Sequence, residues 1–384
     1  MPPHLLTIPA RINILGNPGD ANEGDFATIS AAVEIRASAI IADAPNIVLE
    51  MLPGKGSPPV CRGEFPAGQH PLPHDGQLNL LEGAINRLYA YSPEFRQKFA
   101  RRGIRITTWS EVPRQSGLGG SSLFILLALA GLRSHYDLDP RLHNDYVLAE
   151  LTQRVEGKEL GIACGFADRY VPLFGGLAYL DYRGKLHHHG IQQEPYVTYE
   201  RLDSFLPGSL ERALPLVAIS TGLQHNSGDV HGRMRPRYLE EHAAWTRSGG
   251  ETPLMVRFMS AAWETAWRGK IALLEGDLVT FGRLMNQNHR LVDEMMVYCG
   301  FEDGAGWANR LCIQAALENG ALGAKLTGAG WGGSVFALVR PGEEERLVNA
   351  WQETAARSGL SNATIHVLHF ATQGLIVRHF SDSE

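Results

Sequence analysis

Runs of apolar residues divide the chain into short strands and longer helices, with no internal repeat. Segments rich in β-branched residues predict strands. They cover residues 35–42, 104–108, 175–181, 214–220, 335–339 and 364–369. Apolar positions at helical spacing predict helices. These cover residues 80–90, 123–135, 145–159, 253–275, 277–296, 306–318 and 342–357. Segments 53–74 and 182–207 are expected to be irregular, the first because of its Pro and Gly content. Strands and helices that do not strictly alternate predict an α+β fold.

Chain length and one break in the pattern indicate two domains. A chain of 384 residues is long enough for two or three domains, each with its own core. The polar stretch before the buried strand at 214–220 places a boundary near 205–213. We therefore predict one domain over residues 1–210 and a second over residues 211–384.

Composition excludes several classes of partner. The formal net charge of −6 gives no reason to expect nucleic acid or an anionic membrane surface. The longest apolar run, at 123–132, is too short to span a bilayer, and the start of the chain lacks a signal-peptide pattern. The four cysteines are scattered without metal-binding spacing, which is typical of reduced thiols in the cytoplasm.

The most informative segment joins a glycine-rich turn to a buried helix. It reads Gly117-Leu118-Gly119-Gly120-Ser121-Ser122 and continues into the apolar run. Unpaired N–H groups at a helix start form a phosphate site, and glycines let the backbone approach it. The segment lacks the Lys of a P-loop and the last glycine of a dinucleotide loop. Taken alone, it could also be only a tight strand-to-helix turn.

Two further glycine motifs accompany this loop. One runs over residues 9–20, including Gly16-Asn17-Pro18-Gly19-Asp20, and the other over residues 323–333. Three such motifs in this order resemble the GHMP kinases, and the segment at 158–177 resembles the sugar-1-kinase branch with glucuronokinase and galactokinase. One departure is Gly120, where the family pattern has a serine. The resemblance implies a two-domain GHMP kinase fold with the active site in the cleft between the domains.

The resemblance also implies a role for each motif residue. ATP would lie on Gly117, Leu118, Gly119, Gly120, Ser121 and Ser122. Ser121 and Glu156 would bind Mg²⁺, with Glu159 as the alternative carboxylate. Asp168 would take the proton of the attacking sugar hydroxyl, and Arg11 would hold Asp168 ionised. Substrate-binding residues would be Asn17, Asp20, Gly165, Gly328 and Gly330.

The expected substrate is a small-molecule sugar or uronic acid, phosphorylated at its anomeric hydroxyl. Galactokinases have Glu-His where this chain has Asn17-Pro18, so galactose is not assured. Arg233 and Arg235 are candidates for binding a uronate carboxylate. Two alternatives stay open: a non-catalytic sugar-binding sensor of the same fold, and a family kinase acting on a non-sugar alcohol. We expect a monomer or a homodimer.

Overall fold

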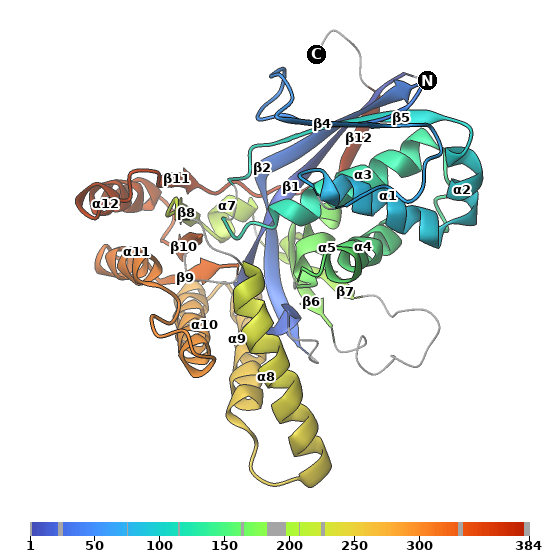
Figure 1. Cartoon of the computed structure of the whole chain (residues 1–384). Coiled ribbons are helices and arrows are strands. Elements are labelled where there is room, and N and C mark those ends of the chain that lie inside the picture. Colours follow the sequence, from blue (N-terminus) through green and yellow to red (C-terminus); the bar gives the residue numbers. More distant parts are fainter. Residues whose placement is uncertain are drawn as a thin grey trace.

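Two sheets of unequal size organise the molecule (Figure 1). The computed structural model describes residues 2–21, 26–74, 76–113, 116–162, 165–182, 197–206, 208–223, 227–328 and 333–379. The larger sheet has eight strands in the order β12-β1-β2-β5-β3-β4, with β6 paired to β2 and β7 paired to β6. Its strands are β1 (His4–Leu15), β2 (Ala27–Ala44), β3 (Ile47–Met51), β4 (Cys61–Phe65), β5 (Gly103–Ser110), β6 (Leu177–Asp181), β7 (Thr198–Arg201) and β12 (Ile376–His379). No helix in the described part of the chain is long and apolar enough to cross a membrane.

The long hairpin of β1 and β2 forms the centre of the larger sheet. Helices cover this part of the sheet: α3 and α5 contact β1 and β2, as does α9, while α10 contacts β1. The helices packed in the first half of the chain are α1 (Asn79–Tyr91), α2 (Pro93–Phe99), α3 (Gly120–His135), α4 (Asp145–Arg154) and α5 (Ala167–Phe174). Because helices lie on both faces, the last eight residues of β1 are all buried. Its sequence therefore lacks the alternation of apolar and polar residues that predicts a strand with one solvent-exposed face.

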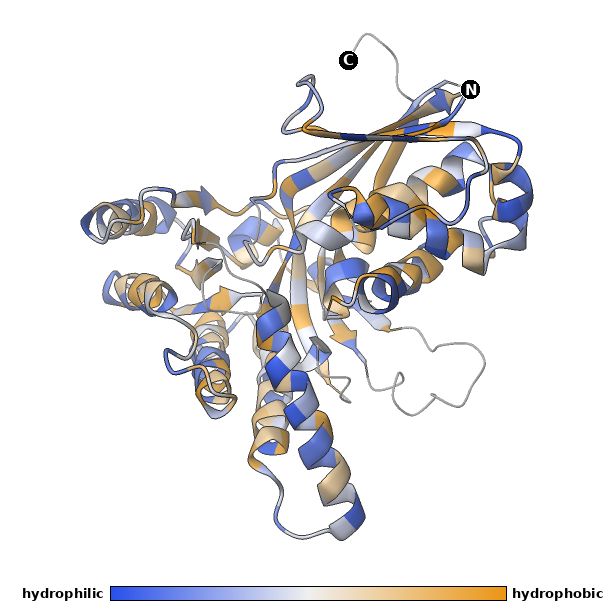
Figure 2. Ribbon diagram, in the orientation of Figure 1, coloured by the Kyte–Doolittle hydropathy of each residue, from blue (hydrophilic) through white to orange (hydrophobic). Residues whose placement is uncertain are grey.

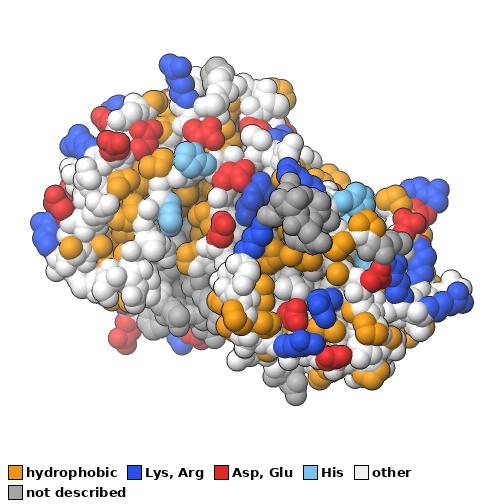
Figure 3. All heavy atoms as spheres, turned by 90° about the horizontal axis from the view of Figure 1, so that it is seen from above, with side chains coloured by type: hydrophobic (Ala, Val, Ile, Leu, Met, Phe, Trp, Pro, Cys, Tyr) orange, Lys and Arg blue, Asp and Glu red, His pale blue; other side chains and the backbone are white. Residues whose placement is uncertain are grey.

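The smaller sheet has four antiparallel strands in the order β11-β8-β10-β9. These strands are β8 (Leu216–Ser220), β9 (Gly323–Thr327), β10 (Ser334–Leu338) and β11 (Thr364–Val367). The helices of this half are α7 (Leu210–Ala213), α8 (Ser227–Ser248), α9 (Leu254–Leu274), α10 (Leu278–Tyr298), α11 (Trp307–Glu318) and α12 (Glu344–Arg357). Hydrophobic positions gather on α3 and the central strands, whereas α8 is largely hydrophilic (Figure 2). Seen from above, two lobes make up the outline (Figure 3).

Most predicted elements are present, three expectations need correction, and one long helix was not predicted. The segment 53–74 contains β4, which pairs with β3 and is therefore not wholly irregular. The segment 182–207 contains β7, which pairs with β6. The helix predicted over 145–159 changes at Val155–Glu159 into a π-helical turn. Arg233 and Arg235 lie near the start of the long helix α8, which the sequence pattern did not predict because its positions are mostly polar. The structure agrees with the predicted α+β class.

Candidate functional site

The glycine loop before α3 and the end of β9 meet backbone to backbone. A Cβ on Gly117 would lie 2.6 Å from the carbonyl oxygen of Thr327, and a Cβ on Gly328 would lie 2.6 Å from Cα of Gly117. Both glycines have positive φ angles, 74° and 78°. The end of β1 joins the same region, because the Asn13 amide donates to Thr327 Oγ1 at 3.3 Å. The second and third motifs are therefore in direct contact, whereas Gly330 lies outside the described residues.

Helix α3 begins at this loop in a way that suits an anion. Gly119, which precedes the helix, has φ 83° and offers no side-chain cap to the first N–H groups. Gly120, Ser121 and Ser122 form the first turn. Uncapped N–H groups and the helix dipole favour negative charge at this end. Gly117–Ser122 can therefore bind phosphate groups.

A buried carboxylate lies beside the two serines. Ser121 Oγ donates to Glu156 Oε1 at 2.9 Å, and Ser122 Oγ reaches the same oxygen at 2.9 Å. The other oxygen, Glu156 Oε2, accepts from Arg169 Nη2 at 2.9 Å. Arg169 and Glu156 are 0% and 1% exposed. The sequence argument for Glu156 did not include Arg169, which neutralises its charge.

The alternative metal residue lies elsewhere. Glu159 forms an ion pair with Arg87 of α1. The hydroxyl groups of Ser121 and Ser122 donate to Glu156 and not to Glu159. In the described part of the chain, no group of three or more His, Cys, Asp or Glu side chains could hold a metal ion unaided. Glu156 is therefore the carboxylate that the geometry favours, and a metal bound there needs further oxygen ligands from elsewhere.

Arg11 and Asp168 form a partly buried ion pair next to the glycine loop. Arg11 Nε donates to Asp168 Oδ1 at 2.7 Å, and Arg11 Nη1 donates to the carbonyl oxygen of Gly117 at 2.5 Å. Arg11 comes from β1 and Asp168 from the first turn of α5. The Asp168 side chain keeps 15% exposure, so it is accessible while Arg11 fixes its position.

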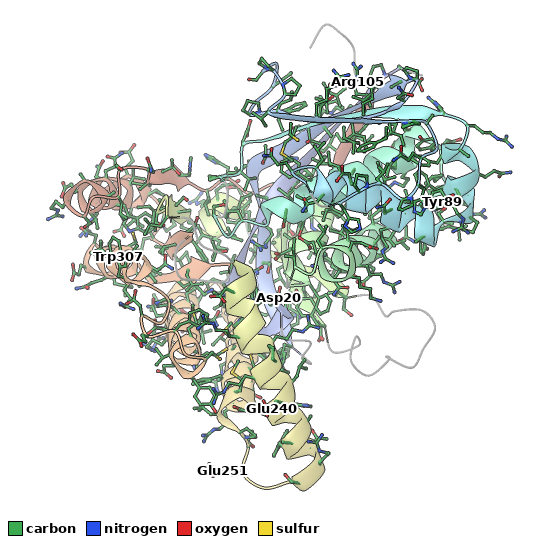
Figure 4. The ribbon with its side chains drawn as sticks, viewed as in Figure 1. Asp20, Tyr89, Arg105, Glu240, Glu251 and Trp307 are labelled. Atoms are coloured by element: carbon green, nitrogen blue, oxygen red, sulfur yellow. The ribbon has the colours of Figure 1, made fainter. Side chains whose placement is uncertain are left out.

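Asp20 is a second carboxylate in the same region, at the junction of the two halves (Figure 4). Its Oδ2 accepts from the Ala167 amide at 3.2 Å, one residue before Asp168. Burial, with the nearby charge of Asp168, raises the pKa of Asp20 to about 6. A Cβ on Gly165 would overlap the Asp20 carboxylate, so a larger residue there would displace the Asp20 side chain. The structure thus brings Asp20, Gly165 and Asp168 together.

Asn17 lies on the same turn and is tied to the second half of the chain. Its Oδ1 accepts from Lys325 Nζ at 2.6 Å, and its carbonyl oxygen accepts from Asn288 Nδ2 at 3.0 Å. Burial lowers the pKa of Lys325 to about 7, while Asp20 opposes this shift. The sequence argument gave Lys325 no defined role. The polar stretch at 286–289 is not a solvated helix face, because Asn288 is fully buried.

Arg233 and Arg235 come from α8. Arg233 Cζ lies 4.5 Å from the centre of the Phe301 ring, and Arg233 Nη2 lies 3.4 Å from Asp229 Oδ2. Burial lowers the pKa of Arg235. Neither observation tests whether these side chains bind a substrate carboxylate, and that role stays a prediction.

Comparison with known proteins places this geometry in context. Residues 79–176 match the family model "GHMP kinases N terminal domain", and residues 308–357 match "GHMP kinases C terminal". The chain is 31% identical over 269 residues to a galactokinase of Thermococcus kodakarensis, covering 66% of this chain and 69% of the relative. It is 28% identical over 360 residues to probable glucuronokinase 2 of Arabidopsis thaliana, covering 91% and 87%.

Solved structures agree on the fold. The galactokinase of Lactococcus lactis complexed with galactose superposes with a TM-score of 0.74 at 20% identity, covering 98% of this chain and 95% of that one. A D-glycero-D-manno-heptose 1-phosphate kinase from Bacteriodes thetaiotaomicron superposes with a TM-score of 0.66 at 18% identity, covering 99% and 100%. The arrangement of sheets and helices is therefore shared across the length of these chains.

Proposed function

The chain belongs to the GHMP kinases, and on that premise we propose that it transfers the γ-phosphoryl group of ATP to the anomeric C1 hydroxyl of a monosaccharide or uronic acid. Its relatives include proteins named galactokinase, glucuronokinase and heptose-phosphate kinase. The observation that carries the proposal is the Arg11–Asp168 pair held against the carbonyl oxygen of Gly117. The pair supports the proposal because the Asp168 carboxylate, which would accept the proton, lies next to the glycine loop.

Phosphoryl transfer depends mainly on positioning and on neutralising charge. Gly117–Ser122 and the start of α3 would bind the triphosphate through backbone N–H groups. Asp168 would accept the proton of the sugar hydroxyl as that oxygen attacks the γ-phosphorus. Arg11 holds the Asp168 carboxylate in position and would add positive charge next to the transferred group. Asp20 and Asn17 would bind other hydroxyls of the sugar.

The residues present fit a magnesium ion. Ser121 Oγ and Glu156 Oε1 are hard oxygen atoms 2.9 Å apart, which is the donor type that Mg²⁺ prefers. The ion would supply positive charge that offsets the negative charge of the phosphates. Because Arg169 already neutralises Glu156, we infer that most of the metal's affinity comes from the nucleotide.

An ADP-release assay against a panel of free sugars and uronic acids tests the proposal. We expect turnover with at least one sugar, and the product of C1 phosphorylation loses its reducing end, which a reducing-sugar assay measures. Mevalonate and homoserine in the same panel test the non-sugar alternative. ATP binding without turnover of any compound would favour the non-catalytic sensor.

Asp168→Asn provides the decisive variant. Asparagine keeps the shape of the side chain but cannot accept the proton, so kcat should fall by a factor of at least about 100. ATP affinity, measured by calorimetry, should stay within twofold, because Asp168 makes no hydrogen bond with Ser121 or Ser122 in the structure. A kcat close to that of the wild type would remove the role assigned to Asp168.

We also propose that the protein is cytoplasmic and that it acts as a monomer or a homodimer. The division into residues 1–210 and 211–384 remains a prediction as well.

A further inference from the structure

Glu156 lies on a short stretch where the helix changes its winding. Helix α4 ends at Arg154, and the chain continues through Val155–Glu159 as a π-helical turn. The Leu160 amide donates to the Val155 carbonyl oxygen at 3.1 Å, five residues back instead of the four of an α-helix. Such turns are uncommon inside helices and often lie at functional sites. The contacts that hold this turn therefore bear on the position of the carboxylate it carries.

The turn directs its two glutamates to different helices. Residues three apart on an α-helix are neighbours on one face. In the π-helical turn, Glu156 accepts from the serine hydroxyl groups at the start of α3. Glu159 instead pairs with Arg87 of α1. The wider turn is thus the geometry in which the two carboxylates reach separate partners.

Helix α1 contacts the turn at two positions, one helical turn apart. A Cβ on Gly83 would lie 2.9 Å from Val155 Cγ1, so α1 packs directly against the start of the π-helical turn. Arg87, four residues later, pairs with Glu159 at the end of the turn. The Arg87 and Glu159 side chains are 18% and 22% exposed, so solvent screens their attraction only in part. Helix α1 therefore holds both ends of the segment that carries Glu156.

We propose that Arg87 is a positioning residue for the metal site: its ion pair with Glu159 fixes the π-helical turn on α1, and the turn fixes the Glu156 carboxylate beside Ser121. Arg87 acts through Glu159 and not on the metal itself. This inference rests on the proposed function. Glu156 keeps its contacts with Ser122 and Arg169 when the Arg87 pair is removed, so the loss should loosen the site without unfolding it.

The affinity for a non-hydrolysable ATP analogue, with and without Mg²⁺, measures this role. Mg²⁺ should tighten binding to the wild type, and Arg87→Met should reduce this gain by a factor of about five or more. The affinity for the metal-free analogue should stay within about twofold, because the start of α3 is unchanged. Calorimetry gives all four affinities without turnover. An equal gain from Mg²⁺ in both proteins would overturn the proposal.

Arg133→Met is the matched control. Arg133 of α3 is 19% exposed and pairs with Asp145 of α4 at 2.7 Å, so this variant removes a comparable ion pair that does not involve the π-helical turn. Both variants should lower the thermal unfolding midpoint to a similar extent. The gain from Mg²⁺ should be unchanged in Arg133→Met. An equally reduced gain in the control would show that the effect of Arg87→Met comes from lost stability, and the proposal would be wrong.

Two further measurements connect the effect to the turn. Amide hydrogen exchange of residues 155–162 should be about tenfold faster in Arg87→Met than in the wild type, and unchanged in Arg133→Met. Arg87→Lys keeps a cation and should retain most of the gain from Mg²⁺. A loss as large as that of Arg87→Met would show that charge pairing does not hold the turn. A wild type that gains affinity from Mg²⁺ but phosphorylates no sugar would contradict the proposed kinase activity, while a reduced gain in Arg87→Met would still support the role of Arg87.

Discussion

At the scale of single residues, the candidate site is a set of buried charges that compensate one another. Arg11 pairs with Asp168, Arg169 pairs with Glu156, and Lys325 lies within the electrostatic influence of Asp20. A buried charge is costly unless it is paired or hydrogen-bonded. Asp20 is a buried carboxyl that has another carboxylate as a neighbour, and burial with this like charge raises its pKa to about 6. Its carboxyl accepts the Ala167 amide but has a like charge, Asp168, nearby.

The raised pKa of Asp20 predicts a specific pH dependence of stability. Its value of about 6, against an ordinary value of 3.8, means that the folded protein binds this proton more tightly than the unfolded chain. The free energy of unfolding should therefore decrease as pH rises from about 4 to about 6, by about 3 kcal/mol at most. In Asp20→Asn this decrease should be absent. Denaturant titrations of both proteins at pH 4.5 and 6.5 measure the difference, and parallel profiles would contradict the prediction.

Sequence reasoning reached the residues of the glycine motifs but missed their buried partners. Ser121, Glu156 and Asp168 lie in recognisable strings, and the structure brings them into one region. Arg169 and Asn288 act through contacts that only the folded chain creates. Asn288 lies on the buried face of α10 together with Phe281, Met285 and Val292, so the helical spacing of the apolar residues indicates that it faces the interior. The spacing does not indicate its partners, Asn17 and Gly16, because they come from a distant part of the chain.

At the scale of elements, the contact between the loop before α3 and the end of β9 is the feature that joins two motifs. Gly117 and Gly328 approach so closely that neither can carry a Cβ without displacing the other's backbone. The glycine spacing predicted a role for each loop, but not this contact. Local pattern also failed for β1 and α8, because a strand covered on both faces and a polar helix each lack the expected periodicity.

Gly328→Ala and Gly359→Ala form a matched pair that tests this contact. Both glycines have similar positive φ angles, 78° and 73°, so alanine costs about 1–2 kcal/mol of backbone strain at each. A Cβ at Gly359 meets nothing within 4 Å, whereas one at Gly328 meets Gly117. Gly328→Ala should raise the KM for ATP about tenfold, while Gly359→Ala leaves it unchanged. Equal KM values in the two variants would show that the contact has no part in ATP binding.

At the scale of the whole molecule, elements from both ends of the chain build one structure. Strand β12, near the end of the chain, pairs with β1, and α9 and α10 pack against β1. The bonds from Lys325 to Asn17 and from Asn13 to Thr327 cross the predicted boundary near residue 210. A boundary derived from composition marks where a polar stretch meets a buried strand. It does not show whether the segments before and after it are stable alone.

We expect that residues 1–210 do not fold independently. In that fragment β1 loses its partner β12, and the buried side chains of Leu15 and Ile29 lose α9, where the absence of a side chain at Gly269 permits close packing. Uncovered apolar surface costs about 25 cal/mol per Å² and favours aggregation. The fragment should show no cooperative thermal transition by circular dichroism, whereas a chain ending at residue 379 should unfold like the full chain. Cooperative unfolding of the fragment would instead establish residues 1–210 as a folding unit.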